Sequence, residues 1–427
     1  MKQQSPIVRG LIAVGVASSI LVTAGCASNP STTSHVTIKF SGWVPGIENA
    51  VTLFNKTHKD ITVDFTRIAS ADSKNLPSEI QAGTAPDVAQ ISASALPSYV
   101  IDKEVQDITS YVEADASKYT TAAWNGVKFS SKVYAVPQDS SPIALMYRKD
   151  LFQKYGISVP KAWDDYVADA KKLHEVNPNV YIGQFSPNEV GLWQADQLQA
   201  GQSWFGTSGD SWTVGIDGSK STAAASRRQE LLDNKLIKVE QMWTPEYWAD
   251  INSGTIASIN YAAWFPVILE QNAPSLTGDW AVAPSPSTSG DGPSSDLGGS
   301  VNVVTKNSKD AQQAAEFISW LNSDPSSLEI LIKQGGLFPA AKAGFNTKAL
   351  NATNPYWNNV NISKVFIAAA KNLSEANVAG PSYDAANAAV DDEFAKVANG
   401  QQTFEQALKA AAATTRSAIK QKGLSVK

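Results

Sequence analysis

The stretch 134–150 reads Y-A-V-P-Q-D-S-S-P-I-A-L-M-Y-R-K-D and is the most informative part of the chain for architecture. Apolar and β-branched residues before Pro137 and after Pro142 predict two short strands, with a polar break between the two prolines. This pattern is more typical of a passage between two lobes than of an ordinary hairpin. The polar side chains at the break, Gln138 and Asp139, are then expected where two domains meet, and small-molecule sites prefer such places.

Composition limits the classes of function. The chain has 427 residues, a formal net charge of −5 at pH 7 and one cysteine. This length fits two domains, and the mild acidity argues against nucleic acid as a partner. A single cysteine excludes an intramolecular disulfide. Twelve tryptophans are many for this length, and large flat rings suit ligand contact as well as core packing.

The N-terminal residues 1–25 have the composition of a secretory signal. They contain Lys2 and Arg9 and no acid, and the run from Leu11 to Ala24 is apolar or small and uncharged. Such a run is the right length for a signal peptide and too short for a membrane span. No later segment approaches about 18 apolar residues, so no transmembrane helix is expected.

Cys26 directly follows this run. The sequence T-A-G-C resembles the bacterial lipoprotein signal, in which the cysteine becomes the lipid-modified N-terminus; Thr23 departs from the usual Leu, Val or Ile. Ordinary secretory cleavage is the alternative. The segment 26–34 is small and polar, so it is expected to be a flexible tether.

Strand and helix patterns alternate in the next part of the chain. The expected order is strand 36–40, helix 48–56, strand 61–65, helix 76–81 and strand 88–91. This alternation predicts an α/β lobe with a largely parallel sheet. Ligands bind beyond the carboxyl ends of strands in such sheets. Trp43 follows the first strand, and Gln90 lies near the end of the third.

A second lobe shows a matching feature. An expected strand at 257–261 leads through Trp264 into a helix at 265–271, so Trp264 occupies the strand-to-helix position that Trp43 has in the first lobe. Two aromatic side chains facing each other across a cleft could sandwich a flat ligand. The glycines at 298–299 allow close backbone approach, either to a ligand or at a second inter-lobe crossing.

Motifs for catalysis and metal binding are missing from the sequence. Its three histidines, His35, His58 and His174, are scattered, and there is no H-E-x-x-H motif or cluster of cysteine and histidine. No nucleophile elbow, P-loop or dinucleotide-binding motif is found. We therefore expect no metal and no cofactor. The 40 acids leave open a glycosidase-type pair of carboxylates.

Nine short motifs occur in an order that resembles one family. They are F-N-K-T-H-K-D-I-T-V (54–63), A-G-T-A-P-D-V (82–88), Y-A-V-P-Q-D (134–139), M-Y-R-K-D-L-F-Q-K-Y-G-I (146–157), P-K-A-W-D-D (160–165), D-W-A-V-A-P (279–284), G-G-S (298–300), A-A-E-F-I-S-W-L (314–321) and G-G-L-F-P-A (335–340). Together they resemble the extracellular solute-binding proteins of ABC importers, in the family that includes maltose-binding protein. Ala162 departs from the threonine usual before Trp163.

The resemblance implies a two-lobe α/β fold of the Venus flytrap type, with hinge crossings near 139–144, 297–301 and 338–343. The expected N-lobe comprises residues 35–139 plus 300–340, and the expected C-lobe comprises residues 140–299 plus 341–427. The ligand would lie between the lobes, and closure would be a hinge motion.

The resemblance also implies a site that stacks sugar rings on aromatic side chains and hydrogen-bonds their hydroxyls. Its expected members are Trp43, Gln90, Asp139, Trp193, Trp264, Gly299, Ser300 and Tyr383, with Trp264 the strongest candidate. The implied protein is a monomeric receptor, not an enzyme, that is lipid-anchored on the outer face of the cell membrane and delivers a carbohydrate to an ABC permease. The alternatives are a secreted carbohydrate-active enzyme and a binding protein for another small polar solute, such as an organic cation or a phosphorylated polyol.

Overall fold

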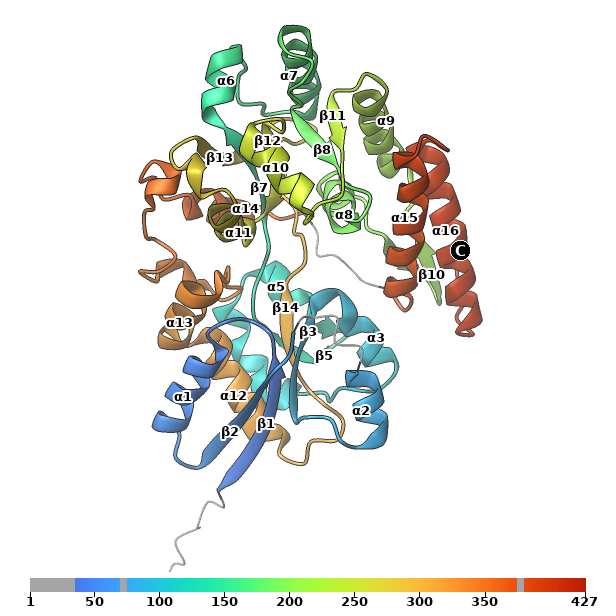
Figure 1. The fold of residues 1–427 in the computed structure, drawn as a ribbon. Coiled ribbons are helices and arrows are strands. Elements are labelled where there is room, and N and C mark those ends of the chain that lie inside the picture. The colour runs from blue at the N-terminus through green and yellow to red at the C-terminus, as the bar shows by residue number, and fades with distance from the viewer. Residues whose placement is uncertain (1–34, 70–74, 375–379) are drawn as a thin grey trace, which may run out of the picture. The chain divides into compact units, whose positions relative to one another are not determined.

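The segment 134–150 joins two separate β-sheets. Its first strand, β6 (Ala135–Pro137), lies at the edge of a five-stranded sheet, and its second, β7 (Ile143–Arg148), is the central strand of a three-stranded sheet. In Figure 1 the chain runs through β7 from one body of the molecule into the other. The prediction of a passage between two lobes is confirmed. We call the lobe with the five-stranded sheet the N-lobe and the other the C-lobe.

The computed structural model describes residues 35–69, 75–374 and 380–427. The expected signal peptide, the tether and Cys26 lie outside the described residues. Among the helices that are described, none is long and apolar enough to cross a membrane.

The described strands fall into five sheets. Besides β6 and β7 they are β1 (Val36–Gly42), β2 (Ile61–Arg67), β3 (Val88–Ser92), β4 (Lys128–Phe129), β5 (Lys132–Val133), β8 (Gly183–Phe185), β9 (Phe205–Ser208), β10 (Ser211–Val214), β11 (Ile237–Val239), β12 (Ser258–Ala262), β13 (Trp280–Pro284) and β14 (Ser300–Val304).

The described helices cover and connect these sheets. The α-helices are α1 (Ile47–Thr57), α2 (Leu76–Ala82), α3 (Leu96–Ile101), α4 (Thr109–Val112), α5 (Thr121–Asn125), α6 (Lys149–Tyr155), α7 (Trp163–Val176), α8 (Val190–Gln199), α9 (Ser219–Asp233), α10 (Pro245–Ser253), α11 (Phe265–Asn272), α12 (Ala311–Ser323), α13 (Pro325–Gly335), α14 (Ser363–Lys371), α15 (Tyr383–Ala398) and α16 (Phe404–Gln421). The 3-10 helices are η1 (Ala93–Ala95), η2 (Glu113–Lys118), η3 (Pro274–Leu276), η4 (Lys342–Asn346) and η5 (Pro355–Trp357).

The N-lobe sheet has the strand order β2-β1-β3-β14-β6. β1 pairs in parallel with β2 and β3, whereas β14 runs antiparallel to both β3 and β6. The expectation of a largely parallel sheet therefore holds for only half of the strand pairs. The reason is topological: β14 follows a second passage of the chain from the C-lobe and enters the sheet from the opposite end.

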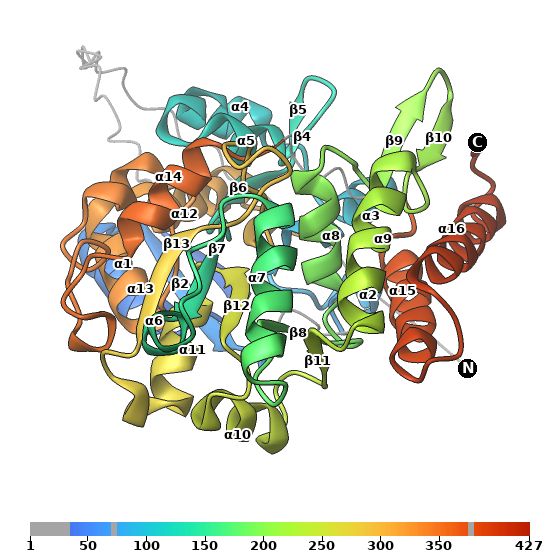
Figure 2. The same ribbon diagram turned by 90° about the horizontal axis from the view of Figure 1, so that it is seen from above.

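The C-lobe sheet is antiparallel, with the order β12-β7-β13. A parallel pair, β8 and β11, lies beside β12. The long helices α15 and α16 pack together against this lobe, as Figure 2 shows from above. A capping box begins α16: the Thr403 hydroxyl accepts from the Gln406 amide at 3.3 Å, and the Gln406 side chain accepts from the Thr403 amide at 2.9 Å.

Each lobe has its own hydrophobic core. Phe40 on β1, Phe54 on α1 and Phe317 on α12 are buried together in the N-lobe, with ring centroids 5.0–5.3 Å apart for the pairs that include Phe317. In the C-lobe, Phe394 on α15 and Phe404 at the start of α16 pack against each other at 5.4 Å. Burying a phenylalanine side chain contributes about 1.5–3 kcal/mol, so these rings hold α1 and α12 on the N-lobe sheet and α15 against α16.

Three segments of the chain lie side by side at the boundary between the lobes. Asp139 forms an isolated β-bridge with Pro339, and Pro142 forms one with Asp296. The Gln138 amide donates to the Ser300 carbonyl at 3.0 Å. The three hinge segments that the family resemblance implied, near 139–144, 297–301 and 338–343, are thus neighbours in space.

The end of α13 packs closely on the turn between β1 and α1. A Cβ on Gly335 would lie 2.6 Å from the Pro45 carbonyl oxygen and 2.9 Å from Val44 Cγ1. The next residue, Gly336, lies against Val267 of α11, because a Cβ there would be 3.2 Å from Val267 Cγ2. These contacts bring the turn that carries Trp43, in the N-lobe, close to the start of α11, in the C-lobe, across the lobe boundary.

We predict that Gly335→Ala lowers the free energy of unfolding by about 1–3 kcal/mol, since a methyl group cannot fit against the rigid Pro45 backbone. Gly126→Ala is the matched control. Gly126 has a helical backbone with φ −63°, and its added Cβ would find its nearest neighbours at 3.5 Å, so this change should be neutral or stabilise by about 0.5 kcal/mol. Urea unfolding followed by tryptophan fluorescence measures both. Equal stability of the two variants would contradict the close packing at Gly335.

Candidate functional site

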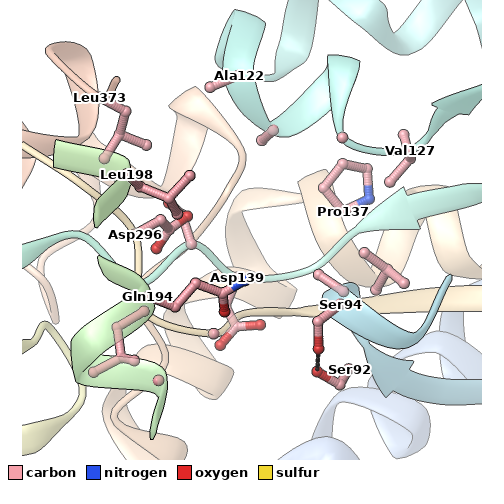
Figure 3. A pocket seen from close by; sticks show the side chains of 18 of the residues that line it. Ser92, Ser94, Ala122, Val127, Pro137, Asp139, Gln194, Leu198, Asp296 and Leu373 are labelled. Carbon is pink, nitrogen blue, oxygen red and sulfur yellow. Dashed lines mark hydrogen bonds between the residues drawn. The ribbon is translucent and has the colours of Figure 1, made fainter. Parts of the chain in front are cut away.

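A cavity of about 260 Å³ lies between the two lobes. We call it the inter-lobe cavity. Its lining residues come from the end of β3, from α5, from both hinge crossings, from α8 and from the start of α15; they are Ser92, Ala93, Ser94, Ala122, Ala123, Gly126, Val127, Pro137, Asp139, Ser140, Gly191, Gln194, Leu198, Asp296, Leu297, Gly298, Val301, Leu373, Ser374 and Tyr383. Figure 3 shows Gln194 and Leu198 on the C-lobe side and Ser92 and Ser94 on the N-lobe side.

Asp139 lies on the first crossing and lines the cavity. Its Oδ1 accepts hydrogen bonds from the Ser300 amide, at 2.5 Å, and from the Ser300 hydroxyl. Burial raises the pKa of Asp139 to about 6, against the lowering effect of these two bonds. The carboxylate therefore ties the first crossing to the second at the edge of the cavity.

Asp296 makes the reverse connection. It lies on the second crossing, and its Oδ1 accepts from the Ser141 amide at 2.5 Å while its Oδ2 accepts from the Ser140 hydroxyl at 3.2 Å. Burial raises the pKa of Asp296 to about 7, and the nearby charge of Asp139 acts in the same direction. Sequence reasoning missed Asp296, because it follows a Ser- and Gly-rich loop that carries no signal of a return to the hinge.

Tyr383, at the start of α15, lines the cavity, and its expected contact with a ligand stays a prediction. Its hydroxyl donates to Gln194 Oε1 of α8 at 2.8 Å. Burial raises its pKa to about 12, while a hydrogen bond with Ser94 of the N-lobe lowers it. Tyr383 therefore contacts groups of both lobes.

Trp264 belongs to a group of aromatic side chains in the C-lobe. It directly precedes α11, as expected, and stacks on Trp243 with ring centroids 6.0 Å apart and an interplanar angle of 21°. Tyr261 meets Trp264 edge to face at 5.1 Å. We call Trp243, Tyr261 and Trp264 the aromatic platform. Trp243 is 38% exposed and Trp264 is half-buried, so the platform offers ring surface to solvent.

Glu189 fixes this platform. Its Oε1 accepts from the Trp243 indole and its Oε2 accepts from the Tyr261 hydroxyl at 2.8 Å. Burial raises the pKa of Glu189, and the two bonds oppose that effect. Glu189 directly precedes α8, whose first turn lines the cavity through Gly191. The platform and the inter-lobe cavity therefore adjoin the same end of one helix.

The backbone at Trp243 is unusual. Its φ of +74° lies in the left-handed region, which bulky residues rarely occupy and which costs about 1–3 kcal/mol when they do. The Glu189 bond and the contact with Trp264 hold the ring in this position. Trp243 was not selected from the sequence, because no local pattern predicts that it packs beside Trp264.

Trp43 and Gln90 are joined to each other rather than to the cavity. Gln90 Oε1 accepts from the Trp43 amide at 2.8 Å and from the Val44 amide at 3.4 Å. Its Nε2 donates to the Ser300 hydroxyl at 3.0 Å and to Gln138 Oε1. Gln90 is 2% exposed, so it connects the Trp43 turn to the hinge. Trp43 itself is half-buried beyond the end of β1.

The turn at 298–300 divides its residues between two environments. Gly298 lines the cavity. Gly299 has φ +110°, and a Cβ there would lie 3.1 Å from the Asp139 carbonyl oxygen, so this position requires glycine. Ser300 is 2% exposed. Its hydroxyl forms hydrogen bonds with Asp139, Gln138 and Gln90.

The structure does not bring Trp193 to the cavity. It is 1% exposed and packs against Phe394 and Phe404 in the C-lobe core, with Arg228 over its ring at 5.4 Å. The expectation that Trp193 contacts a ligand is corrected on this point: its face of α8 is directed toward α15 and α16. Gln194, the next residue along, lines the cavity instead.

No group of three or more His, Cys, Asp or Glu side chains that could hold a metal ion occurs in the described parts of the chain. The site offers carboxyl, hydroxyl and amide groups in the cavity, with exposed aromatic rings beside it. Such a set can hydrogen-bond a polar molecule and stack on its apolar faces.

A family model matches residues 35–326 of the chain, and its description is bacterial extracellular solute-binding protein. The chain belongs to this family. Its two-lobe fold is that of the sugar-binding proteins among its structural neighbours.

Several individual proteins are similar to this solute-binding protein. The arabinooligosaccharide-binding protein of Bacillus subtilis is 22% identical over 354 residues, which cover 79% of this chain and 81% of the relative. The galacto-N-biose/lacto-N-biose I-binding protein of an ABC transporter from Bifidobacterium longum, solved with lacto-N-biose, is 28% identical with a TM-score of 0.83, covering 92% of this chain and 99% of that one. An ABC-transporter-associated binding protein from B. animalis subsp. lactis, solved with β-1,6-galactobiose, is 28% identical with a TM-score of 0.78 at the same coverage.

We predict that Asp296→Asn gains stability relative to the unchanged protein as the pH rises. The pKa of Asp296 is about 7 in the folded protein and about 4 in an unfolded chain, so the stability it contributes is fully present below about pH 4 and is lost as the pH rises to 7. The melting temperature of the variant minus that of the unchanged protein should therefore increase by about 2 °C or more between pH 4 and pH 8.

Differential scanning calorimetry across this pH range measures that difference. Asp210→Asn, at an exposed turn of the β9–β10 hairpin, is the control for removal of one negative charge. A pH-independent difference for Asp296→Asn would show that this carboxyl does not titrate in the folded state as its burial requires.

Proposed function

We propose that the protein is the substrate-binding component of an ABC importer and that it holds a carbohydrate, an oligosaccharide, at the inter-lobe cavity and the aromatic platform. The observation that carries this proposal is the platform, since Trp243 and Trp264 are stacked, partly exposed and fixed through Glu189 beside a cavity rich in hydrogen-bonding groups. Sugars present apolar C–H faces to aromatic rings and hydroxyl groups at their edges. The carbohydrate ligands named for the similar Bifidobacterium and Bacillus proteins support the same class.

The hinge can couple ligand binding to closure of the two lobes. Asp139 and Asp296 each bridge the two crossings and also line the cavity. A ligand favours closure only by binding the closed state better than the open one. Hydroxyl groups that reach these carboxylates together with Tyr383 would supply such a difference. A sugar that lacks one hydroxyl leaves a buried polar group without a partner, which costs about 1–3 kcal/mol and so gives specificity.

The proposed cellular setting follows from the N-terminal sequence. Cys26 would carry lipid and hold the protein at the outer face of the cell membrane, and residues 26–34 would give it reach toward the permease. We propose that it acts there as a monomer and without enzymatic activity.

A specific observation raises the enzyme alternative. Asp139 and Asp296 place two carboxyl groups in one cavity with raised pKa values, and glycosidases use pairs of carboxyl groups. Both groups, however, accept hydrogen bonds from the hinge backbone, which fits a role in holding the crossings. The chain also belongs to a family of solute-binding proteins, which favours a receptor over an enzyme.

We predict that neutral di- and trisaccharides stabilise the protein without being consumed. A thermal-shift screen with arabinobiose, arabinotriose, β-1,6-galactobiose, lacto-N-biose, maltose and cellobiose should give at least one shift of several degrees, because a ligand at 100 times its Kd stabilises by about 2.7 kcal/mol. Chromatography of the same mixtures should show intact sugar. Bond cleavage would favour the enzyme, and shifts only with choline or glycerol phosphate would favour another solute.

We predict that Trp264→Ala removes the ligand-induced shift of the best sugar, because it removes one ring of the stacked pair. Tyr111→Ala, which changes a 47% exposed aromatic residue on α4 of the N-lobe, is the control and should keep the full shift. Isothermal titration would quantify the loss, expected to be about tenfold or more in Kd. An unchanged affinity would remove Trp264 from the site.

We predict that Cys26→Ser releases the protein from the membrane. When the full chain is produced in a bacterium with lipoprotein-processing enzymes, the unchanged protein should incorporate an alkyne-labelled fatty acid and sediment with membranes. The variant should do neither. Incorporation of label into the Cys26→Ser protein would place lipidation elsewhere, and absence of label from both would favour ordinary secretory cleavage.

A further inference from the structure

The inter-lobe cavity contains two carboxyl groups, and no Lys, Arg or His occurs among the described residues that line it. We propose that Asp139 and Asp296 make the site charge-selective, so that it accepts neutral or cationic sugars and rejects uronates and phosphorylated sugars. This inference rests on the proposed carbohydrate function and adds to it the charge class of the ligand, with Asp296 as a specificity-determining residue.

Both carboxylates keep hydrogen-bonding capacity for a ligand. A carboxylate offers about four acceptor positions. Asp139 uses Oδ1 for both Ser300 contacts. Asp296 accepts from Ser141 through Oδ1 and from Ser140 through Oδ2. Ligand hydroxyl or ammonium groups can donate to the remaining positions, whereas an anionic group has nothing to donate.

The surroundings do not neutralise these charges. Burial raises the pKa of both carboxyl groups, and for Asp296 the charge of Asp139 adds to the effect, whereas the opposing influences are hydrogen bonds from Ser300, Ser140 and nearby backbone amides rather than cations. A basic residue within a few ångströms would act in the opposite direction. The two carboxylates therefore present an uncompensated negative potential to the cavity.

The arginines beside Trp43 and Trp193 have partners of their own. Arg67, whose Nη1 donates to the Trp43 carbonyl at 2.6 Å, is paired with Glu48 at 2.5 Å. In the C-lobe, Arg228 is paired with Asp196. The aromatic platform adds a third carboxylate, Glu189, whose donors are neutral side chains.

An anionic sugar in this site would therefore meet like charges without a counter-ion. Two like charges a few ångströms apart in a partly enclosed site repel strongly enough to change affinity tenfold or more. Neutral hydroxyl groups meet no such repulsion, and an ammonium group is attracted. The two carboxylates of the hinge, Asp139 and Asp296, are then sufficient to discriminate between anionic and neutral sugars.

The first experiment measures the charge preference of the unchanged protein. Isothermal titration at pH 8, above both raised pKa values, compares the neutral sugars named above with digalacturonate, cellobiouronate, lactose 6-phosphate and the diamine made by deacetylating chitobiose. The expected result is that no uronate or phosphate binds within about tenfold of the best neutral or cationic sugar. A uronate or sugar phosphate as the best ligand overturns the inference and leaves carbohydrate binding standing. No binding of any sugar overturns the proposed function itself, and this inference with it.

The second experiment assigns the preference to the two carboxyl groups. Asp296→Asn and Asp139→Asn should each reduce the ratio of neutral-sugar affinity to digalacturonate affinity by about tenfold, since asparagine keeps an oxygen acceptor for the hinge amides and loses the charge. Asp210→Asn, at the exposed hairpin turn, should leave that ratio unchanged. Circular dichroism establishes that each variant is folded, and the two sites give independent tests. An unchanged ratio in the folded Asp296 or Asp139 variants, or an equal change in Asp210→Asn, overturns the inference.

Discussion

The structure depends on two aspartates that bond in opposite directions across the hinge. Asp139 on the first crossing accepts from the Ser300 amide, and Asp296 on the second accepts from the Ser141 amide. A carboxylate that accepts a backbone N–H forms a charge-assisted bond, which is shorter and stronger than a neutral one. The two crossings are therefore held in one register between the lobes. Because both carboxylates also line the cavity, the groups that hold the hinge are the groups a ligand would meet.

This constraint extends into the N-lobe through Gln90. Its side-chain nitrogen donates to Ser300 and its oxygen accepts from the Trp43 amide. Close packing leaves little freedom on this path: a Cβ on Gly42 would lie 2.9 Å from Gln90 Oε1. The position of the Trp43 turn is thus coupled to the second crossing by one buried amide group. We assign Gln90 a positioning role on this basis, because all of its hydrogen-bonding groups have protein partners.

The sequence predicts features that depend on neighbouring residues better than features that depend on residues far apart in the chain. Local patterns predicted the passage at 134–150, the strand before Trp43 and the strand-to-helix turn at Trp264, since periodicity and proline positions are properties of neighbouring residues. The mixed direction of the N-lobe sheet was not predicted, because it depends on a strand that returns from the other lobe. Trp193 was expected at the site through the family resemblance, and only packing against α15 and α16 places it in the core. Asp296 had no signal at all, because its partners are more than 150 positions away.

The aromatic platform contains two features that cost energy. Trp243 has a left-handed backbone, and Glu189 is a carboxyl group that burial makes harder to ionise. Neither the left-handed backbone at Trp243 nor the buried carboxyl group of Glu189 stabilises the fold on its own. Together they place an indole ring parallel to Trp264 and leave part of its face exposed. The strain at Trp243 and the desolvation of Glu189 are offset by the bond between them, which holds the Trp243 ring beside Trp264. In the proposed function, rings that are already held in place would lower the ordering cost of binding, and a flat sugar face would use the whole stacking interaction for affinity.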